Sequence, residues 1–313
     1  MRFATATLTL LAASPAVVSA AGKLGWALGN KKEDGSTCKT SSDYEDDFDA
    51  IKSETGSTVV RTYSATDCNT TSHILPAAKS KDFQIVLGIW VYSDDEDDAS
   101  FVNDFAEVKK VVEDGEYNDY IYAVTVGSES LYREDVSGDF LNKRIKTVKE
   151  AMPDGIKVGT ADSWNKFQDG TANPVIEGGY ADILLANAFS YWQGQKISNA
   201  TGSFYDDVYQ AFGVIQEKSG STDGIELWVG ETGWPTDGDD YQNAEPSVAN
   251  AEQFYHEAIC GMTTWGFNVF VFEAFDEPGK EGAVGEDGTV ADETHWGAMN
   301  ADRTLKWDSG LKC

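Results

Sequence analysis

Two glutamates follow apolar segments of the chain, and each stands in a glycine-containing block. Glu129 ends the segment Val126–Glu129, and Glu231 lies within Trp228–Pro235. A charged side chain at the end of an apolar segment costs free energy unless it has partners or a chemical task. Hydrolysis of a glycoside needs two carboxyl groups that flank one bond, about 5–5.5 Å apart when the enzyme retains the anomeric configuration. The alternative is that each glutamate forms an ion pair that only tethers loops.

Both segments belong to a series of eight short apolar or β-branched runs. Several runs are almost continuously apolar, which is typical of strands covered on both faces. A helix-length segment separates successive runs, so the alternation predicts an α/β fold, a (β/α)8 TIM barrel, as a single domain over residues 21–313. The active site of such a barrel lies at the C-terminal ends of the strands. The runs are Leu24–Asn30, Thr58–Ala65, Gln84–Val91, Ile121–Ser130, Lys157–Trp164, Ile183–Tyr191, Glu226–Trp234 and Asn268–Glu277.

Three of the intervening segments carry apolar residues at helical spacing. We expect Ser100 to cap the first helix, the second to follow Ser203, and the third to begin at Ser247. A further helix is expected to start near Ser137 and to end before Pro153. The apolar positions are Phe101, Phe105, Val108 and Val112, then Phe204, Val208, Phe212 and Ile215, then Ala251, Phe254, Ala258 and Met262.

Residues 1–20 have the features of a secretory signal peptide. Arg2 precedes the mostly apolar stretch Phe3–Val18, and a small-residue cleavage pattern follows. No segment approaches the roughly 18 apolar residues that a membrane-spanning helix needs. The net charge of −29 disfavours nucleic acid and anionic membranes as partners. The acidic run Asp94–Asp98 is expected to be a solvated loop, since it lacks the ligand spacing and central glycine of an EF-hand.

The cysteines suggest two disulfides in an exported chain, although four cysteines allow three connectivities. We expect Cys38–Cys68 and Cys260–Cys313, which pairs sequence neighbours at each end of the domain. Neither the scattered cysteines nor the three histidines show the spacing of a zinc site, so no metal and no cofactor is expected. Glycosylation acceptor triplets consistent with secretion begin at Asn69 and Asn199.

The sequence resembles glycoside hydrolase family 17, and within it the fungal cell-wall branch of endo-β-1,3-glucanases and 1,3-β-glucanosyltransferases. The resemblance implies that Glu129 is the acid/base and Glu231 the nucleophile. One departure concerns Ser128, because related barrel families place there an asparagine that binds the sugar 2-hydroxyl. The Ser128 hydroxyl or Asn187 would have to replace it. The similarity covers Leu24–Leu311, and the blocks that carry it are Val126–Glu129, Asn187–Gln195, Gly230–Pro235, Phe272–Glu277 with Lys280, and His295–Gly297.

Aromatic side chains at strand ends offer flat apolar faces on which sugar rings could stack. For each of them the alternative is packing in the core or in a loop, and this alternative is strongest for Trp90. Glu277 and Lys280 match positions near the cleft in the family, where they would bind hydroxyls or steady the nucleophile. Their alternative is a plain surface ion pair. The strand-end aromatic residues are Tyr63, Trp90, Trp164, Tyr191 and Trp234, and all of them except Trp90 are taken as candidate binding residues.

The resemblance implies a secreted cell-wall enzyme, which we expect to be a monomer, that cleaves internal bonds of β-1,3-glucan with retention. Nearby negative charge would raise the pKa of Glu129, which must begin protonated. Once Glu231 is esterified, Glu129 can ionise and act as the base. Transfer to another glucan chain gives transglycosylation, and transfer to water gives hydrolysis. The alternatives are a purely hydrolytic endo-β-1,3-glucanase and a catalytically vestigial glucan-binding wall protein.

Overall fold

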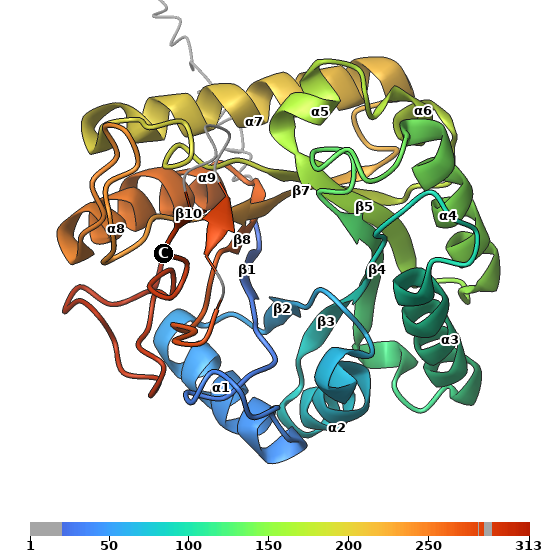
Figure 1. Cartoon of the computed structure of the whole chain (residues 1–313), viewed down its shortest axis with the longest axis horizontal. Coiled ribbons are helices and arrows are strands. Elements are labelled where there is room, and N and C mark those ends of the chain that lie inside the picture. Colours follow the sequence, from blue (N-terminus) through green and yellow to red (C-terminus); the bar gives the residue numbers. More distant parts are fainter. Residues whose placement is uncertain (1–20, 281, 285–289) are drawn as a thin grey trace, which may run out of the picture.

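The computed structural model describes residues 21–280, 282–284 and 290–313 and shows a closed barrel of eight parallel strands (Figure 1). The strands follow one another in chain order, and β8 pairs with β1 to close the barrel, with Leu24 opposite Val269. The predicted (β/α)8 fold is confirmed. The strands are β1 (Leu24–Ala27), β2 (Val59–Arg61), β3 (Gln84–Ile89), β4 (Ile121–Ser128), β5 (Lys157–Ser163), β6 (Ile183–Asn187), β7 (Glu226–Thr232) and β8 (Asn268–Val271), and a small antiparallel pair adds β9 (Ala283–Val284) and β10 (Val290–Ala291).

Each predicted run contains one of these strands, but several strands end earlier than the apolar pattern does. β2 ends at Arg61, β6 at Asn187 and β8 at Val271. Beyond these points the backbone leaves the ladder and forms the loops at the C-terminal rim. The polar and aromatic residues of the expected site therefore lie on loops as well as on strand ends.

The helices form the outer ring (Figure 1). Ser137 and Ser247 cap helices as predicted, since their hydroxyls accept from the backbone N–H groups three residues on. The predicted start of a helix after Ser203 is wrong, because α7 begins at Ile197. The bounds are α1 (Ser41–Thr55), η1 (Asp67–Asn69), α2 (Thr70–Lys81), α3 (Ala99–Asp114), η2 (Asn118–Tyr120), α4 (Gly138–Ala151), α5 (Trp164–Gln168), α6 (Asn173–Glu177), α7 (Ile197–Ser219), α8 (Val248–Phe254), the π-helical turn η3 (Tyr255–Ile259) and α9 (Cys260–Thr264).

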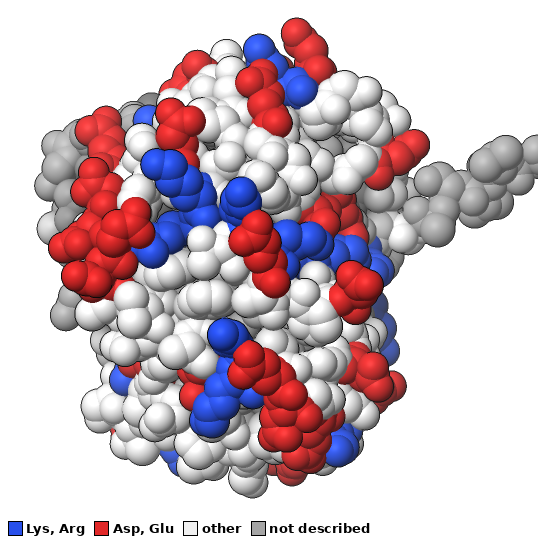
Figure 2. All heavy atoms as spheres, turned by 90° about the vertical axis from the view of Figure 1, so that its right-hand side faces the viewer, with Lys and Arg blue, Asp and Glu red and all other residues white. Residues whose placement is uncertain are grey.

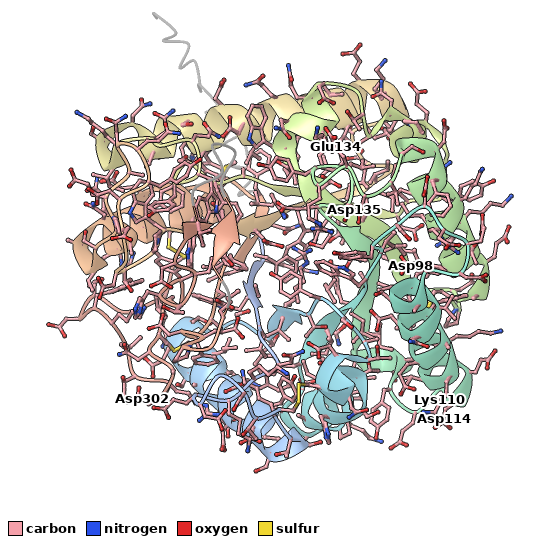
Figure 3. All side chains as sticks on the ribbon, in the orientation of Figure 1. Asp98, Lys110, Asp114, Glu134, Asp135 and Asp302 are labelled. Carbon is pink, nitrogen blue, oxygen red and sulfur yellow. A yellow bond between two sulfur atoms is a disulfide. The ribbon has the colours of Figure 1, made fainter. Side chains whose placement is uncertain are left out.

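The cap of α3 is Asp98 and not Ser100, which corrects the prediction (Figure 3). The Asp98 carboxylate accepts from the N–H of Ser100 at 3.0 Å and from that of Tyr92 at 2.8 Å, so it closes the loop as well as the helix. Asp94–Asp97 are exposed, as expected for a solvated loop, whereas Asp98 is buried. On the flank formed by α3 and α4, acidic and basic side chains are interleaved (Figure 2).

The part of the barrel interior away from the C-terminal strand ends is filled by apolar side chains. We call this part the barrel floor. Trp228 and Phe270 stack there with ring centroids 4.4 Å apart, among the inward-facing side chains of the other strands. Because apolar side chains fill the barrel floor, the charged side chains at the C-terminal strand ends can extend only into the space at the C-terminal rim.

Both predicted disulfides, Cys38–Cys68 and Cys260–Cys313, are present. The first joins the loop after β1 to η1, and the second attaches the last residue of the chain to α9. The predicted signal peptide, residues 1–20, lies outside the described residues. Among the helices of the described ranges, none has the length and apolar character needed to cross a bilayer.

Candidate active site

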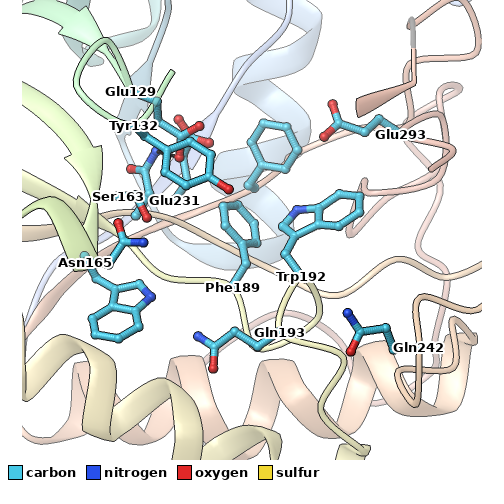
Figure 4. A pocket seen from close by; sticks show the side chains of 13 residues that line it. Glu129, Tyr132, Ser163, Asn165, Phe189, Trp192, Gln193, Glu231, Gln242 and Glu293 are labelled. Atoms are coloured by element: carbon cyan, nitrogen blue, oxygen red, sulfur yellow. Dashed lines mark hydrogen bonds between the residues drawn. The ribbon is translucent and has the colours of Figure 1, made fainter. Parts of the chain in front are cut away.

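A cavity of about 580 Å³ opens at the C-terminal end of the barrel and contains both Glu129 and Glu231 (Figure 4). Glu129 follows the end of β4, and Glu231 lies near the end of β7. The fold thus brings two carboxyl groups from distant parts of the chain to one pocket, as retaining glycoside chemistry requires. The other lining residues are Tyr132, Ser163, Trp164, Asn165, Asn187, Phe189, Trp192, Gln193, Gln242, Phe272 and Glu293.

Glu129 is held in a protonated state by its surroundings. Its backbone leaves β4 in the left-handed region at φ 56°, and its N–H donates to the Ala161 carbonyl of β5 at 2.9 Å. The Asn187 side-chain amide donates to Oε1 of Glu129 at 2.9 Å, a bond that by itself lowers the pKa of Glu129. Burial, reinforced by the negative charge of Glu231, raises the pKa of Glu129 to about 8. A carboxyl group with such a pKa can donate a proton at neutral pH.

Glu231 faces a positive charge instead. Nη1 of Arg61 donates to Oε1 of Glu231 at 2.8 Å, and the Arg61 side chain is fully buried. A charge-assisted bond of this kind favours the ionised carboxylate that a nucleophile must be. Arg61 was not predicted as a site residue, although an arginine within the apolar strand β2 was a signal that could have identified it.

The structure separates the two candidates for holding the sugar 2-hydroxyl. The Ser128 hydroxyl accepts from Nη2 of Arg61 at 2.9 Å, so it already serves the guanidinium. Asn187 donates one N–H to Glu129, while its Oδ1 is buried and has no hydrogen-bond partner within the described structure. Because buried polar atoms are normally hydrogen-bonded, Asn187 is the better placed of the two to accept a bond from a sugar hydroxyl.

A second cavity of about 290 Å³ lies beside the first and contains Tyr63, Trp90, Glu277 and Lys280. The Tyr63 hydroxyl is buried and has no partner within the described residues. Trp164, by contrast, lines the larger pocket with Glu129. Of the predicted binding residues, Trp164 and Asn187 therefore lie in one cavity, and Tyr63, Glu277 and Lys280 lie in the other.

Lys280 is the centre of a carboxylate cluster between these cavities. Its Nζ lies 3.0 Å from Oε1 of Glu273, 3.0 Å from Oε2 of Glu277 and 4.0 Å from Oε2 of Glu293, which lines the larger pocket. Burial and the neighbouring Glu277 raise the pKa of Glu273. Burial acts in the same direction on Glu277, but the positive charge of Lys280 outweighs it and lowers the pKa of Glu277. The alternative of a plain surface ion pair for Glu277 and Lys280 does not describe this site.

Tyr191 and Trp234 do not face either cavity, which corrects their assignment as stacking residues. They are 2% and 3% exposed, and their rings pack edge to face at 5.3 Å. The polar end of each ring is already satisfied by a backbone carbonyl, of Asp239 and Glu245 respectively. Trp192 lines the pocket in their place, stacked on Trp296 with ring centroids 5.4 Å apart.

Asp162 is a second buried ionisable residue near the site that was not predicted from the sequence. It is fully buried in β5, and its carboxylate accepts from the backbone N–H groups of Leu131, Tyr132 and Ser163 at 2.9 to 3.1 Å. Burial raises its pKa to about 7. These bonds fix the loop that follows Glu129 and thereby place Tyr132 at the pocket. Within the described residues, no group of three or more His, Cys, Asp or Glu side chains is arranged to hold a metal ion.

Residues 25–297 match the model of the BtgE/BtgC glycoside hydrolase domain. The chain belongs to this family. A glucan 1,3-beta-glucosidase of Arthroderma benhamiae is 49% identical over the whole chain and 98% of its own length, and one of Saccharomyces cerevisiae is 43% identical over 98% of each chain. The glycoside hydrolase family 17 beta-1,3-glucanosyltransferase of Rhizomucor miehei superposes with a TM-score of 0.75 at 31% identity, over 90% of this chain and 94% of that one. An active-site mutant of that enzyme binds laminaritriose. The resemblance to family 17 found in the sequence is confirmed.

Proposed function

We propose that this protein is a retaining enzyme that cleaves internal bonds of β-1,3-glucan and transfers the glycosyl group to another glucan chain or to water. The observation that carries the proposal is that one pocket holds two glutamates in opposite environments, one buried beside a negative charge and one bonded to Arg61. The names of the relatives supply the substrate class.

In the first half-reaction the Glu231 carboxylate attacks the anomeric carbon while the bond from that carbon to the leaving oxygen breaks. The leaving oxygen takes the proton of Glu129. In the second half-reaction, the ionised Glu129 takes a proton from the acceptor hydroxyl, whose oxygen displaces Glu231 from the anomeric carbon. Loss of the Glu231 charge in the intermediate removes the repulsion that adds to burial in raising the pKa of Glu129, so Glu129 ionises more readily there.

The two cavities suggest where the two arms of the substrate lie. Glu129 and Glu231 both line the larger pocket, and neither lines the cavity that contains Tyr63 and Lys280. The oxygen that Glu129 protonates therefore lies in the larger pocket, and we assign the glucan attached to that oxygen to the same pocket. The same pocket would receive the acceptor, because the acceptor oxygen replaces the leaving oxygen. The donor arm would extend over Tyr63 and Trp90.

Product analysis on a defined β-1,3-linked glucose hexasaccharide tests the proposal. Products longer than the hexasaccharide are expected, and they show transfer. If all products are shorter than the hexasaccharide, the protein is instead a purely hydrolytic endo-β-1,3-glucanase. No cleavage by the folded protein would favour a vestigial glucan-binding wall protein.

Azide rescue tests the assignment of the two glutamates. Glu231→Gly with added azide should give an α-glycosyl azide, because azide occupies the position of the missing nucleophile. A β-azide from this variant would mean that the acid/base had been removed and that the roles are reversed.

We further propose that the protein is exported to the cell wall, where its glucan substrate would lie. The two disulfides are stable in an oxidising compartment, and the asparagines of the two acceptor triplets, Asn69 and Asn199, are exposed. Detection of the mature chain, starting near residue 21, in the wall fraction of the producing cells would test this setting.

A further inference from the structure

Asp207 is a buried carboxylate in the middle of α7, away from Glu129 and Glu231 in the sequence. It is 4% exposed and belongs to no ion pair among the described residues. Its Oδ2 accepts from Nε2 of Gln193 at 2.5 Å. Burial raises the pKa of Asp207 to about 6. A buried carboxylate whose partner is a neutral amide costs free energy, so its presence calls for a role.

Its partner Gln193 lines the catalytic pocket. Figure 4 places Gln193 at the end of the pocket away from Glu129 and Glu231. The Ser203 hydroxyl donates to Oε1 of Gln193 at 2.9 Å, while Asp207 accepts from Nε2. Because an ionised carboxylate cannot donate, these two bonds allow the amide of Gln193 only one orientation. One N–H and one lone pair of the amide are left for a ligand.

We propose that Asp207 and Ser203 are positioning residues that hold the Gln193 amide as a hydroxyl-binding group for the acceptor glucan. The proposal rests on the proposed function, which assigns the leaving and acceptor arms to this pocket. Sugar hydroxyls both donate and accept hydrogen bonds, and the amide offers one group of each kind. An amide of fixed orientation binds such a hydroxyl without first losing rotational freedom.

Transfer and hydrolysis measured on the same β-1,3-linked hexasaccharide test this role. In Asp207→Leu and in Ser203→Ala, the ratio of transfer to hydrolysis is expected to fall about three- to tenfold, the factor for one neutral hydrogen bond. The fall should come from a higher KM for the acceptor and not from a lower kcat. Asp207→Asn should lose no more than about twofold, because its amide oxygen can still accept from Gln193, although its N–H groups also permit the reversed orientation of the Gln193 amide.

Asp206→Asn is the matched control. Asp206 lies in the same turn of α7, and its carboxylate accepts from the amide of Gln210 at 2.9 Å on the exposed surface. Its removal should leave the ratio unchanged, although it deletes the same charge.

An unchanged ratio in Ser203→Ala, or a loss in Asp207→Asn as large as that in Asp207→Leu, would overturn the proposal. An equal fall in transfer and hydrolysis would also overturn it and indicate a structural role. If Asp207→Leu does not fold, Ser203→Ala still tests the proposal, because this variant loses only a half-buried hydroxyl. Absence of any cleavage by the wild type would contradict the proposed function itself, so the two failures can be told apart.

Discussion

At the residue scale, the charge next to each glutamate explains why two identical side chains can have different catalytic roles. Glu129 is buried next to a carboxylate, and Glu231 is bonded to a guanidinium. The folded chain keeps the proton of Glu129 up to about pH 8, whereas an ordinary glutamate loses it near 4.5. Between these values the unfolded state has released a proton that the folded state still binds, so this group lowers stability as pH rises.

Glu129→Gln should therefore stabilise the protein while it abolishes the acid/base role. Its Tm relative to the wild type is expected to rise by about 4 °C between pH 5 and pH 8, equivalent to roughly 2 kcal/mol for a chain of this size. Activity should fall by several orders of magnitude. Calorimetry at both pH values measures the first effect, with the exposed Glu113→Gln as control. A Tm difference that is constant with pH would contradict the proposed protonation state.

Arg61 carries a further prediction, because its guanidinium bonds to Glu231, to the Gly230 carbonyl and to Ser128. Arg61→Met leaves a nearly buried carboxylate without its cation, which typically costs about 3–5 kcal/mol. Both the Tm and kcat should fall. Arg61→Lys keeps the charge but cannot reach all three partners, so its losses should be intermediate. If Arg61→Met kept wild-type kcat, the guanidinium would have no part in holding the nucleophile.

The sequence was informative about Glu129 and Glu231 because each stands in a distinctive block at the end of an apolar strand. It could not place Tyr191 and Trp192 correctly, because β6 ends at Asn187 and the alternation of a strand no longer fixes which side chain faces inward. One position of difference decides that Trp192 lines the pocket while Tyr191 is buried behind it. Arg61 was missed because its partners lie on other strands.

At the element scale, the eight strands were predictable because parallel barrel strands are apolar on both faces. Their C-terminal ends were not, since the polar loop residues there are interspersed with aromatic ones. The cap of α3 shows a similar limit. Asp98 and Ser100 are both good capping residues, and only the loop bond from Tyr92 to Asp98 decides between them.

The two disulfides lead to a prediction at the same scale. They close loops with sequence separations of 30 and 53 residues, and loss of either should cost about 3.5–4 kcal/mol in the chain-entropy model. Replacement of Cys38 and Cys68 by serine should also raise KM, because that disulfide adjoins Asn30 and Asp67 in the second cavity. The Cys260–Cys313 pair lines neither cavity and serves as the control. Equal KM values for the two double variants would show that the second cavity binds no part of the substrate.

At the scale of the whole molecule, the net charge of −29 and the buried carboxyl groups act in the same direction. Mutual repulsion among the many negative charges destabilises the compact state. Burial raises the pKa of several carboxyl groups, so the folded state binds protons that the unfolded state has lost. Others act in the opposite sense, such as Glu277, whose lowered pKa contributes stability that disappears as pH falls through it. The raised values are about 8 for Glu129, about 7 for Asp162, about 7 for Glu293 and about 6 for Asp207.

The stability maximum should consequently lie on the acidic side of neutrality, with a Tm at pH 5 above that at pH 8 by about 5–10 °C at low ionic strength. Salt separates the two causes, because it screens exposed charges much more than buried ones. In 0.5 M sodium chloride the difference between pH 5 and pH 8 should shrink, since surface repulsion is screened. The Tm difference should not vanish, since the buried carboxyl groups still release their protons at a higher pH in the folded state than in the unfolded state. A difference that disappears in salt would assign the whole effect to the surface, and a higher Tm at pH 8 would contradict both causes.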